Sequence, residues 1–194
     1  MLTVADKAMI SRIVACYRSA DLAQVIAGRN WYPTVKKIAE HIHPSYIAGA
    51  GVIAALSPRV KWDENIKAAV TVCQVALSGS EIPPDVIGMC RNRDKAWKIA
   101  RGEYKYSPLE LLNSSNGAYK VNAFFANIIG DTQLVTVDVW AARVAIPEFD
   151  EESVRHNRYL MVQDAYQKAA KRIGDITPRD LQAVCWVNVR GSAE

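Results

Sequence analysis

The fold of this chain is decided by residues 107–143, SPLELLNSSNGAYKVNAFFANIIGDTQLVTVDVWAAR. Residues 107–110 (SPLE) have the capping-box form of a helix start, with a hydroxyl at the cap, proline at the first helical position and glutamate at the third. Residues 114–117 (SSNG) then end that helix, because asparagine and glycine adopt left-handed backbone angles at low cost and serine competes for backbone hydrogen bonds. A short helix followed by a tight polar turn is therefore predicted.

A second helix is predicted to begin at Tyr119 and to end at Gly130. Lys120 lies in its first turn, where the positive end of the helix dipole and nearby apolar surface both disfavour an ammonium ion. Such a lysine is easier to deprotonate, which makes it a better nucleophile. The apolar residues that share one face of this helix are Val121, Phe124, Phe125, Ile128 and Ile129.

A third helix is predicted to begin at Asp138. Residues 134–137 (LVTV) are mostly β-branched and are expected to be extended, and the apolar run 139–146 follows them, so that Asp138 occupies an N-cap position. Taken singly, a first-turn lysine is typical of a solvated surface charge, and an aspartate before an apolar helix is typical of a plain cap. Lys120 and Asp138 together, at the starts of successive helices after a hairpin, indicate a functional pair.

The order of these parts resembles the helix-hairpin-helix DNA glycosylase superfamily, of which endonuclease III is a member. The likeness is carried by the hairpin, by Lys120, and by the helix start at Val137-Asp138 with Arg143-Val144 beyond it. It extends to other segments, so that about three quarters of the chain is covered in the same order. These segments are residues 51–57 (GVIAALS) with the helix that carries Asn65 and Lys67, residues 91–100, and residues 181–191. A weaker likeness connects the chain to small phage-encoded proteins of unassigned function.

Two positions depart from the family pattern. The family hairpin usually has Gly-x-Gly shortly before the lysine, which lets backbone amides approach a DNA phosphate closely, whereas this chain has Asn116-Gly117-Ala118. The family often has a histidine two residues after the aspartate, where this chain has Trp140. The docking of DNA on the hairpin and the surroundings of the carboxylate are therefore expected to differ from the family pattern.

The resemblance implies an all-α, two-lobed DNA N-glycosylase, with abasic-site lyase activity as a second expected step. Such an enzyme flips a modified or damaged base out of double-stranded DNA into a pocket between its lobes. By this resemblance Lys120 would attack the anomeric carbon of the sugar and form a Schiff base, and Asp138 would stabilise the positive charge that develops on the sugar and assist proton transfer. The lobes would be about residues 1–44 plus 138–194 and about residues 45–137, with the hairpin at 107–129 in the second lobe.

Two further groups of residues are candidates for contact with DNA. In the loop at residues 57–62 (SPRVKW), cations would meet phosphates and a long side chain would fill the gap left by an extruded base, although a solvated loop with one packed tryptophan is the alternative. The candidate DNA-binding residues are Arg59, Lys61, Asn116, Gly117, Ala118 and Tyr119. The candidate stacking residues of the base pocket are Trp31, Tyr32, Trp62 and Trp140, and a place in the core is the competing interpretation for each.

Two other functions are compatible with the same residues. One keeps the fold and uses Lys120 and Asp138 to modify a phage-type DNA base rather than to excise it. The other is a non-catalytic DNA- or protein-binding module, which the altered hairpin and the modest charge favour. The net charge of +4 and the pI near 8.9 permit binding to nucleic acid without requiring it.

Composition and cysteine spacing restrict the class of protein. Of the 194 residues 50% are hydrophobic and 23% are charged, as in an ordinary soluble domain, and no run approaches the roughly 20 apolar residues of a membrane span. A cytoplasmic protein is expected, associated with the nucleoid or located in the host cytoplasm if the chain is phage-encoded.

The four cysteines are too scattered for a zinc or iron–sulfur site, so no metal and no cofactor is expected and each thiol is interpreted as buried or incidental. They are Cys16, Cys73, Cys90 and Cys185.

Cap and stop signals along the whole chain predict an all-α fold of about ten helices. Thr3 is expected to cap the first helix. Asp21 is expected to cap a short helix to about Ala27, and residues 30–33 (NWYP) are expected to open a separate helix that ends near His43. Ser45 is expected to cap an unusually apolar helix that lies centrally in the fold.

Overall fold

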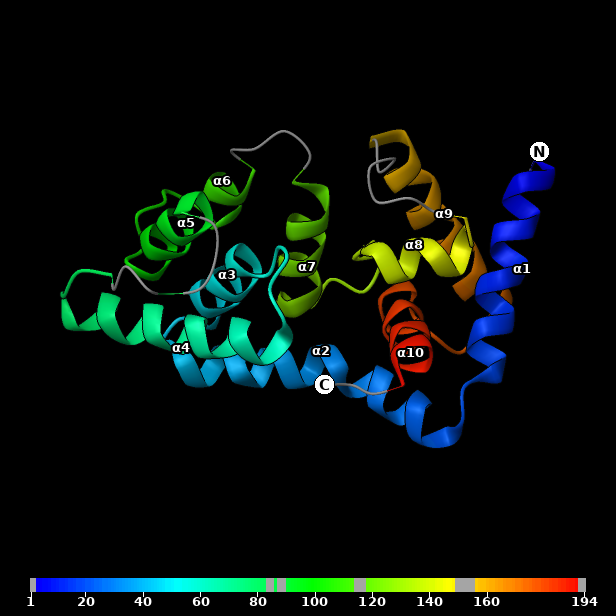
Figure 1. The fold of residues 1–194 in the computed structure, drawn as a ribbon, viewed down its shortest axis with the longest axis horizontal. Coiled ribbons are helices and arrows are strands. Elements are labelled where there is room, and N and C mark those ends of the chain that lie inside the picture. Colours follow the sequence, from blue (N-terminus) through cyan, green and yellow to red (C-terminus); the bar gives the residue numbers. More distant parts are fainter. Residues whose placement is uncertain (1–2, 83–85, 87–89, 114–117, 149–155, 192–194) are drawn as a thin grey trace. The chain divides into compact units, whose positions relative to one another are not determined.

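The computed structural model of the 194-residue chain describes residues 3–82, 86, 90–113, 118–148 and 156–191 (Figure 1). These residues form ten helices and no strand, which confirms the predicted all-α fold. In chain order the helices are α1 (Val4–Ser19), α2 (Leu22–Ile42), α3 (Tyr46–Leu56), α4 (Trp62–Ser78), α5 (Cys90–Ala100), α6 (Leu109–Leu112), α7 (Tyr119–Ile129), α8 (Val139–Ala145), α9 (His156–Ile173) and α10 (Pro178–Arg190).

Capping residues set many of these boundaries where the sequence predicts them. Thr3 caps α1 with a complete capping box, Ser45 caps α3, and Thr177 caps α10. Each supplies a side-chain oxygen to a backbone N–H of the first turn, which would otherwise have no partner. Gly79 ends α4 with a φ of 74°, the left-handed conformation that glycine adopts without steric cost.

Helix α2 contradicts the prediction of two separate helices, because it continues through Pro33 without a break. Proline has no N–H to donate to the carbonyl of Arg29, so a break before Pro33 is the local expectation. Tyr32, however, is only 2% exposed, and its hydroxyl lies within hydrogen-bond distance of two polar side chains from distant parts of the chain. These tertiary contacts keep Tyr32 in the helix and outweigh the local preference.

The chain divides into two compact units. One unit consists of Met1–Pro33 and Gly130–Ala193, and the other consists of Thr34–Ile129. The divisions fall inside α2 and directly after α7. The lobes expected from the resemblance divide the chain near residues 44 and 137, and their role as the two lobes of a DNA glycosylase stays a prediction.

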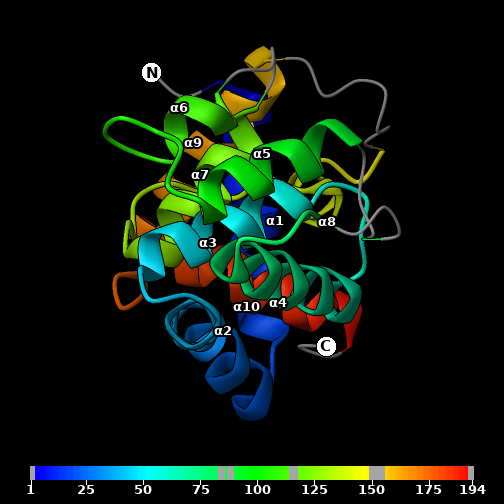
Figure 2. The same cartoon turned by 90° about the vertical axis from the view of Figure 1, so that its left-hand side faces the viewer.

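Helix α3 is the centre of the unit formed by Thr34–Ile129. Its residues from position 48 to position 56 are all buried, and it packs against α4, α5 and α7 (Figures 1 and 2). Two glycines make close packing around α3 possible: a Cβ atom at Gly49 would lie 2.4 Å from the carbonyl oxygen of Ala39, and one at Gly51 would lie 2.9 Å from Cβ of Pro108. Through the second contact, α3 supports the start of the hairpin at Pro108.

The unit formed by Met1–Pro33 and Gly130–Ala193 has its core between α1, α8, α9 and α10. Val135 and Val137 belong to this core, with exposed fractions of 0% and 4%. The residues that precede α8 are therefore held by packing, although they form neither helix nor strand. This anchoring fixes the backbone on the N-terminal side of Asp138.

Candidate functional site

Lys120 lies in the first turn of α7, as the sequence predicts. Its helix is anchored by Phe125 and Ile128, which are 0% and 1% exposed, while the Lys120 side chain is half-buried. The side-chain amide of Asn122 donates a hydrogen bond to the side-chain oxygen of Asn113. Because Asn113 caps the end of α6, this bond ties together the two helical arms of the hairpin on which Lys120 is placed.

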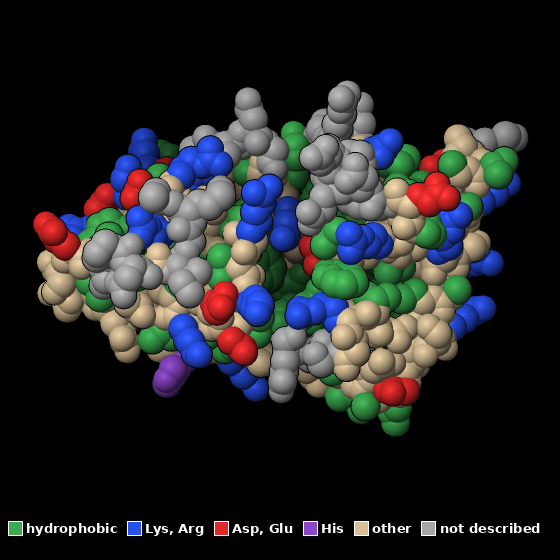
Figure 3. Space-filling view, viewed as in Figure 1, with side chains coloured by type: hydrophobic (Ala, Val, Ile, Leu, Met, Phe, Trp, Pro, Cys, Tyr) green, Lys and Arg blue, Asp and Glu red, His purple; other side chains and the backbone are tan. Residues whose placement is uncertain are grey.

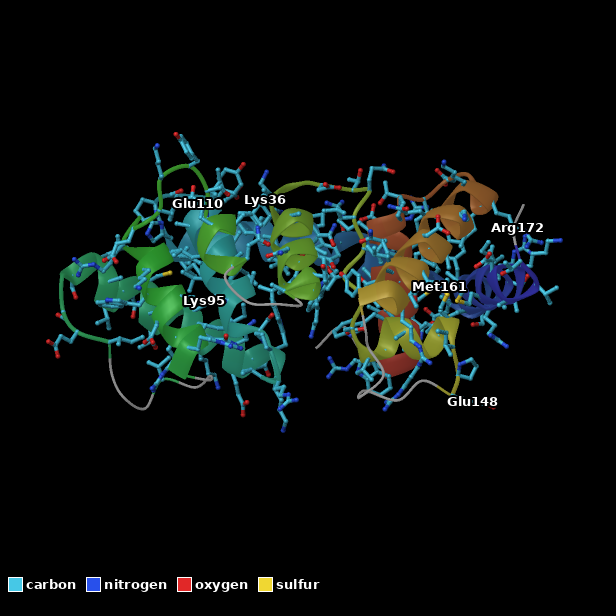
Figure 4. All side chains as sticks on the ribbon, turned by 90° about the horizontal axis from the view of Figure 1, so that it is seen from above. Lys36, Lys95, Glu110, Glu148, Met161 and Arg172 are labelled. Atoms are coloured by element: carbon cyan, nitrogen blue, oxygen red, sulfur yellow. The ribbon has the colours of Figure 1, made fainter. Side chains whose placement is uncertain are left out.

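The entry to the hairpin is fixed by Glu110. Its carboxylate accepts hydrogen bonds from the backbone N–H groups of Lys105, Tyr106 and Ser107, and these bonds lower the pKa of Glu110 (Figure 4). The bond from Ser107 is one half of the predicted capping box, although α6 itself begins two residues later. The local sequence therefore orders the approach to the hairpin through one acidic side chain.

Of the predicted DNA-binding residues of the hairpin, the structure describes Ala118 and Tyr119. Asn116 and Gly117 lie outside the described residues. Ala118 is half-buried and its carbonyl accepts the backbone N–H of Asn122 at 2.9 Å, whereas Tyr119 is 40% exposed. The Tyr119 ring is thus accessible to solvent at the start of α7.

Asp138 is the N-cap of α8, which confirms its predicted position. Its Oδ1 accepts a hydrogen bond from the backbone N–H of Ala141 at 2.8 Å. The carboxylate therefore stabilises the first turn of α8 whatever else it does, because it satisfies an N–H that has no partner within the helix.

Two buried tyrosines hold the backbone on both sides of Asp138, and a third contacts a side chain of the same segment. The Tyr159 hydroxyl donates to the carbonyl of Val135 at 2.9 Å and accepts the N–H of Val137 at 3.3 Å. The Tyr166 hydroxyl donates to the carbonyl of Ala141 at 3.2 Å. These bonds position the carboxylate on a backbone that is fixed before and after it.

The third tyrosine is Tyr32, whose hydroxyl lies 3.0 Å from Oγ1 of Thr136 and 3.1 Å from Oε1 of Gln182. A phenol has one proton and the amide oxygen only accepts, so Tyr32 donates to Gln182 and accepts from Thr136. The guanidinium of Arg179 lies 5.4 Å from the centre of the Tyr32 ring and forms an ion pair with Asp180 at 2.9 Å. The segment before Asp138 is thus part of a hydrogen-bonded polar cluster inside the unit.

Electrostatics connect this cluster to Asp138. Burial raises the pKa of Tyr32, Tyr159 and Tyr166, and the charge of Asp138 raises each of them further. The three hydroxyls therefore remain protonated and donate hydrogen bonds. Sequence reasoning missed this arrangement, although Tyr159 and Tyr166 are seven residues apart and so fall on one face of α9.

The four candidate stacking residues occupy different surroundings. Tyr32 belongs to the interior, as described above, which supports the core interpretation for this residue. Trp31 packs against Trp186, with ring centres 4.9 Å apart. Trp62, the first residue of α4, is half-buried. Trp140, two residues after Asp138, is 37% exposed, and the guanidinium of Arg143 lies 5.6 Å from the centre of its ring.

The loop between α3 and α4 carries two exposed cations, Arg59 and Lys61. Among the residues that the structure describes, Arg59 is the only non-glycine residue with φ in the left-handed region, at 62°. That conformation costs a residue with a Cβ roughly 1–2 kcal/mol. Arg59 and Lys61 share a unit with Lys120 and Trp62, whereas Asp138 lies in the other unit.

A model of one protein family matches residues 2–193 of the chain. The chain belongs to DUF7178, a family of unknown function. No curated protein and no solved structure matches it. Within the described ranges, no helix has the length and apolar character needed to cross a membrane, and no group of three or more His, Cys, Asp or Glu residues could hold a metal ion.

An open groove between α1 and α9 of this DUF7178 protein was not predicted. It has a volume of about 320 Å³ and lies in the same unit as Asp138. Its lining consists of Lys7, Ile10, Lys168, Lys171 and Arg172. Figure 4 shows Arg172 beside α1, where its guanidinium lies 3.5 Å from the hydroxyl of Ser11.

The charge of this groove is only partly balanced. Lys168 forms an ion pair with Asp164 at 2.5 Å, whereas Lys7, Lys171 and Arg172 pair with no carboxylate in the described part of the chain. The face seen in Figure 3 carries both Lys or Arg and Asp or Glu side chains. Lys171 and Arg172 lie in the last turn of α9, where the helix dipole stabilises positive charge, so their position also has a structural explanation. The groove nevertheless offers cations to a phosphate from two helices.

Proposed function

We propose that the protein is a DNA N-glycosylase with abasic-site lyase activity, acting on a flipped modified or damaged base. The observation that supports this most is the position of Lys120 in the first turn of α7, the second arm of a hairpin whose arms are tied together. A lyase mechanism requires an amine that is held close to the sugar of the bound DNA.

In the proposed reaction, the Lys120 amine attacks the anomeric carbon of the flipped nucleotide and the base departs with its bonding electrons. Asp138 stabilises the positive charge that develops on the sugar as the bond to the base breaks. Its backbone is held by Tyr159 and Tyr166, so the carboxylate does not have to reorganise during the reaction. The bond from the anomeric carbon to the ring oxygen of the sugar then breaks, and the ring oxygen takes up the proton that the amine loses. A Schiff base remains, from which strand cleavage can follow.

Lys120 and Asp138 belong to different compact units. The proposed reaction therefore uses one group from each unit. It acts on an extruded nucleotide, because the bond between base and sugar is inaccessible in a stacked duplex.

A borohydride trapping assay tests the lyase half of this proposal. Duplexes that carry an abasic site, or oxidised, deaminated or alkylated bases, are incubated with the protein and reduced. The wild-type protein is expected to form a covalent adduct with at least one duplex, because borohydride reduces the Schiff base to a stable amine. Lys120→Gln is expected to form none.

The matched control is Lys67→Gln, which removes an exposed lysine from α4 in the same unit. It is expected to be trapped as efficiently as the wild type. If no duplex is trapped, or if Lys120→Gln is trapped equally well, the lyase activity is rejected. Analysis of the bases in the treated DNA separates excision from modification, because excision releases a free base and modification leaves it attached to its sugar.

A second candidate function, a non-catalytic DNA-binding module, is favoured by the groove between α1 and α9. Lysine and arginine side chains that meet phosphates release counterions from DNA, so the affinity falls steeply with salt. The groove supplies Lys7, Lys171 and Arg172 for such contacts without using Lys120 or Asp138.

Removing two groove cations is expected to weaken binding to duplex DNA under this second function. The double variant Lys171→Gln, Arg172→Gln should reduce the dependence of log Kd on log salt by about one for each lost phosphate contact. Fluorescence anisotropy over a salt series measures this slope. The control is Lys37→Gln, Lys67→Gln, which makes the same change in net charge at two exposed lysines of the other unit. Equal slopes for both double variants would exclude the groove as a DNA contact.

A further inference from the structure

Two cysteines, Cys16 of α1 and Cys185 of α10, lie against each other inside one compact unit. The sulfur of Cys16 lies 4.0 Å from the carbonyl oxygen of Cys185, and the sulfur of Cys185 lies 3.8 Å from the carbonyl oxygen of Ile13, one turn before Cys16. Each sulfur is therefore at the backbone of the helix that carries the other.

Asn188 provides a polar contact to one of the two sulfurs. Its side-chain amide nitrogen lies 3.7 Å from the sulfur of Cys16 and donates to the carbonyl of the same residue at 2.8 Å. It also lies 2.9 Å from the hydroxyl of Ser19, so its orientation is fixed by more than one partner. An N–H fixed beside a sulfur stabilises the thiolate form of that sulfur.

The two thiols have unequal accessibility and acidity. Cys16 is half-buried, whereas Cys185 is 0% exposed. The neighbouring Cys185 thiol lowers the pKa of Cys16, and the Asn188 amide adds to this effect. The neighbouring Cys16 thiol, together with burial, raises the pKa of Cys185. The more accessible thiol is thus also the one that ionises more easily.

We propose that Cys16 and Cys185 form a redox-active pair, in which Cys16 exchanges with a low-molecular-weight disulfide and Cys185 then closes a disulfide bond between α1 and α10. The pair does not depend on the proposed action on DNA, since neither cysteine belongs to the candidate site. The sequence alone predicts only that each of the four thiols is buried or incidental, and the pair adds a specific chemistry for two of them.

The exchange balances with a disulfide such as oxidised glutathione as the oxidant. The thiolate of Cys16 attacks one sulfur of that disulfide, the bond between its sulfurs breaks, and one glutathione thiolate leaves and takes up a proton. Cys185 then loses its proton to the solvent, and its sulfur attacks that of Cys16, which expels the second glutathione thiolate. The two protein thiols are oxidised by two electrons, and one disulfide is reduced to two thiols.

The test is oxidation of the folded full-length chain with oxidised glutathione, followed by alkylation of the remaining thiols, digestion and mass spectrometry. A peptide pair linked through Cys16 and Cys185 is expected, preceded in time by glutathione attached to Cys16. Cys73 is 0% exposed and burial raises its pKa to about 12, so Cys73→Ser is the matched control and should not change the result.

Three variants separate the roles of the residues. Cys185→Ser is expected to accumulate the mixed disulfide at Cys16, and Cys16→Ser is expected to form neither product. Asn188→Ala is expected to slow the first step roughly threefold or more, because one hydrogen bond to the thiolate is lost. If circular dichroism shows that Cys185→Ser is unfolded, two other results test the proposal. These are the order in which the wild type forms the mixed disulfide and the linked pair, and the rate of the first step in Asn188→Ala. Oxidation at other thiols, or a mixed disulfide at Cys16 that never proceeds to the linked pair, overturns the proposal.

Discussion

Replacing Gly28 by alanine is expected to lower the free energy of unfolding by about 2 kcal/mol or more. At an unhindered position in a helix, the same change would raise stability by about 1 kcal/mol, because alanine has a much higher helix propensity than glycine. At Gly28, however, the new Cβ would lie 2.4 Å from Cα and 2.6 Å from the backbone nitrogen of Val184. Since both are backbone atoms, no rotation of a side chain relieves the collision, and α2 and α10 have to separate.

Thermal denaturation followed by circular dichroism measures this effect, and a loss of about 2 kcal/mol corresponds to a fall in Tm of roughly 4–8 °C for a chain of this size. Asn30→Ala is the matched control, because Asn30 is an exposed residue of α2 two positions later. It should change the stability by less than about 0.5 kcal/mol. The sign of the Gly28 result is decisive: a stabilised variant would mean that α2 and α10 do not approach as closely as described.

Local signals in the sequence predicted the starts and ends of most helices, because a cap or a stop acts within one turn of the chain. The positions of Lys120 in the first turn of α7 and of Asp138 at the N-cap of α8 are examples. Each depends on residues no more than a few positions away, such as Gly130, which ends α7 with a φ of 124°. The candidate residues could therefore be assigned to helix starts before any coordinates existed.

Arrangements that depend on distant residues could not be predicted in this way. The continuation of α2 through Pro33 depends on contacts between Tyr32 and residues more than 100 positions later. From its neighbours in the sequence, Gly28 is expected only to weaken its helix. Its close approach to Val184 depends on how two distant helices pack, which the sequence around Gly28 does not indicate. The groove brings Lys7 together with cations from the other end of the chain. In each case packing between helices decides the outcome, and helical periodicity does not specify which faces meet.

Replacing Asp138 by asparagine is expected to reduce the rate of base excision by about 100-fold or more while the fold stays intact. Asparagine is as good an N-cap as aspartate. Its side-chain oxygen can therefore still accept the N–H of Ala141, which lies 2.8 Å from Oδ1 of Asp138 in the wild type. What the substitution removes is the negative charge that would stabilise the sugar cation. Single-turnover excision of a substrate identified by the trapping assay measures this loss.

Asp138→Ala separates the charge of the residue from its role as a cap. Alanine removes both the charge and the hydrogen bond. The excision rate of this variant should therefore fall as far as that of Asp138→Asn, and its free energy of unfolding should fall by about 1 kcal/mol in addition. A variant Asp138→Asn with the stability and the excision rate of the wild type would show that Asp138 is a cap alone, because the charge would then have no part in the reaction. A stable but inactive Asp138→Asn would instead assign the loss to the carboxylate, since the helix start that it caps would be unchanged.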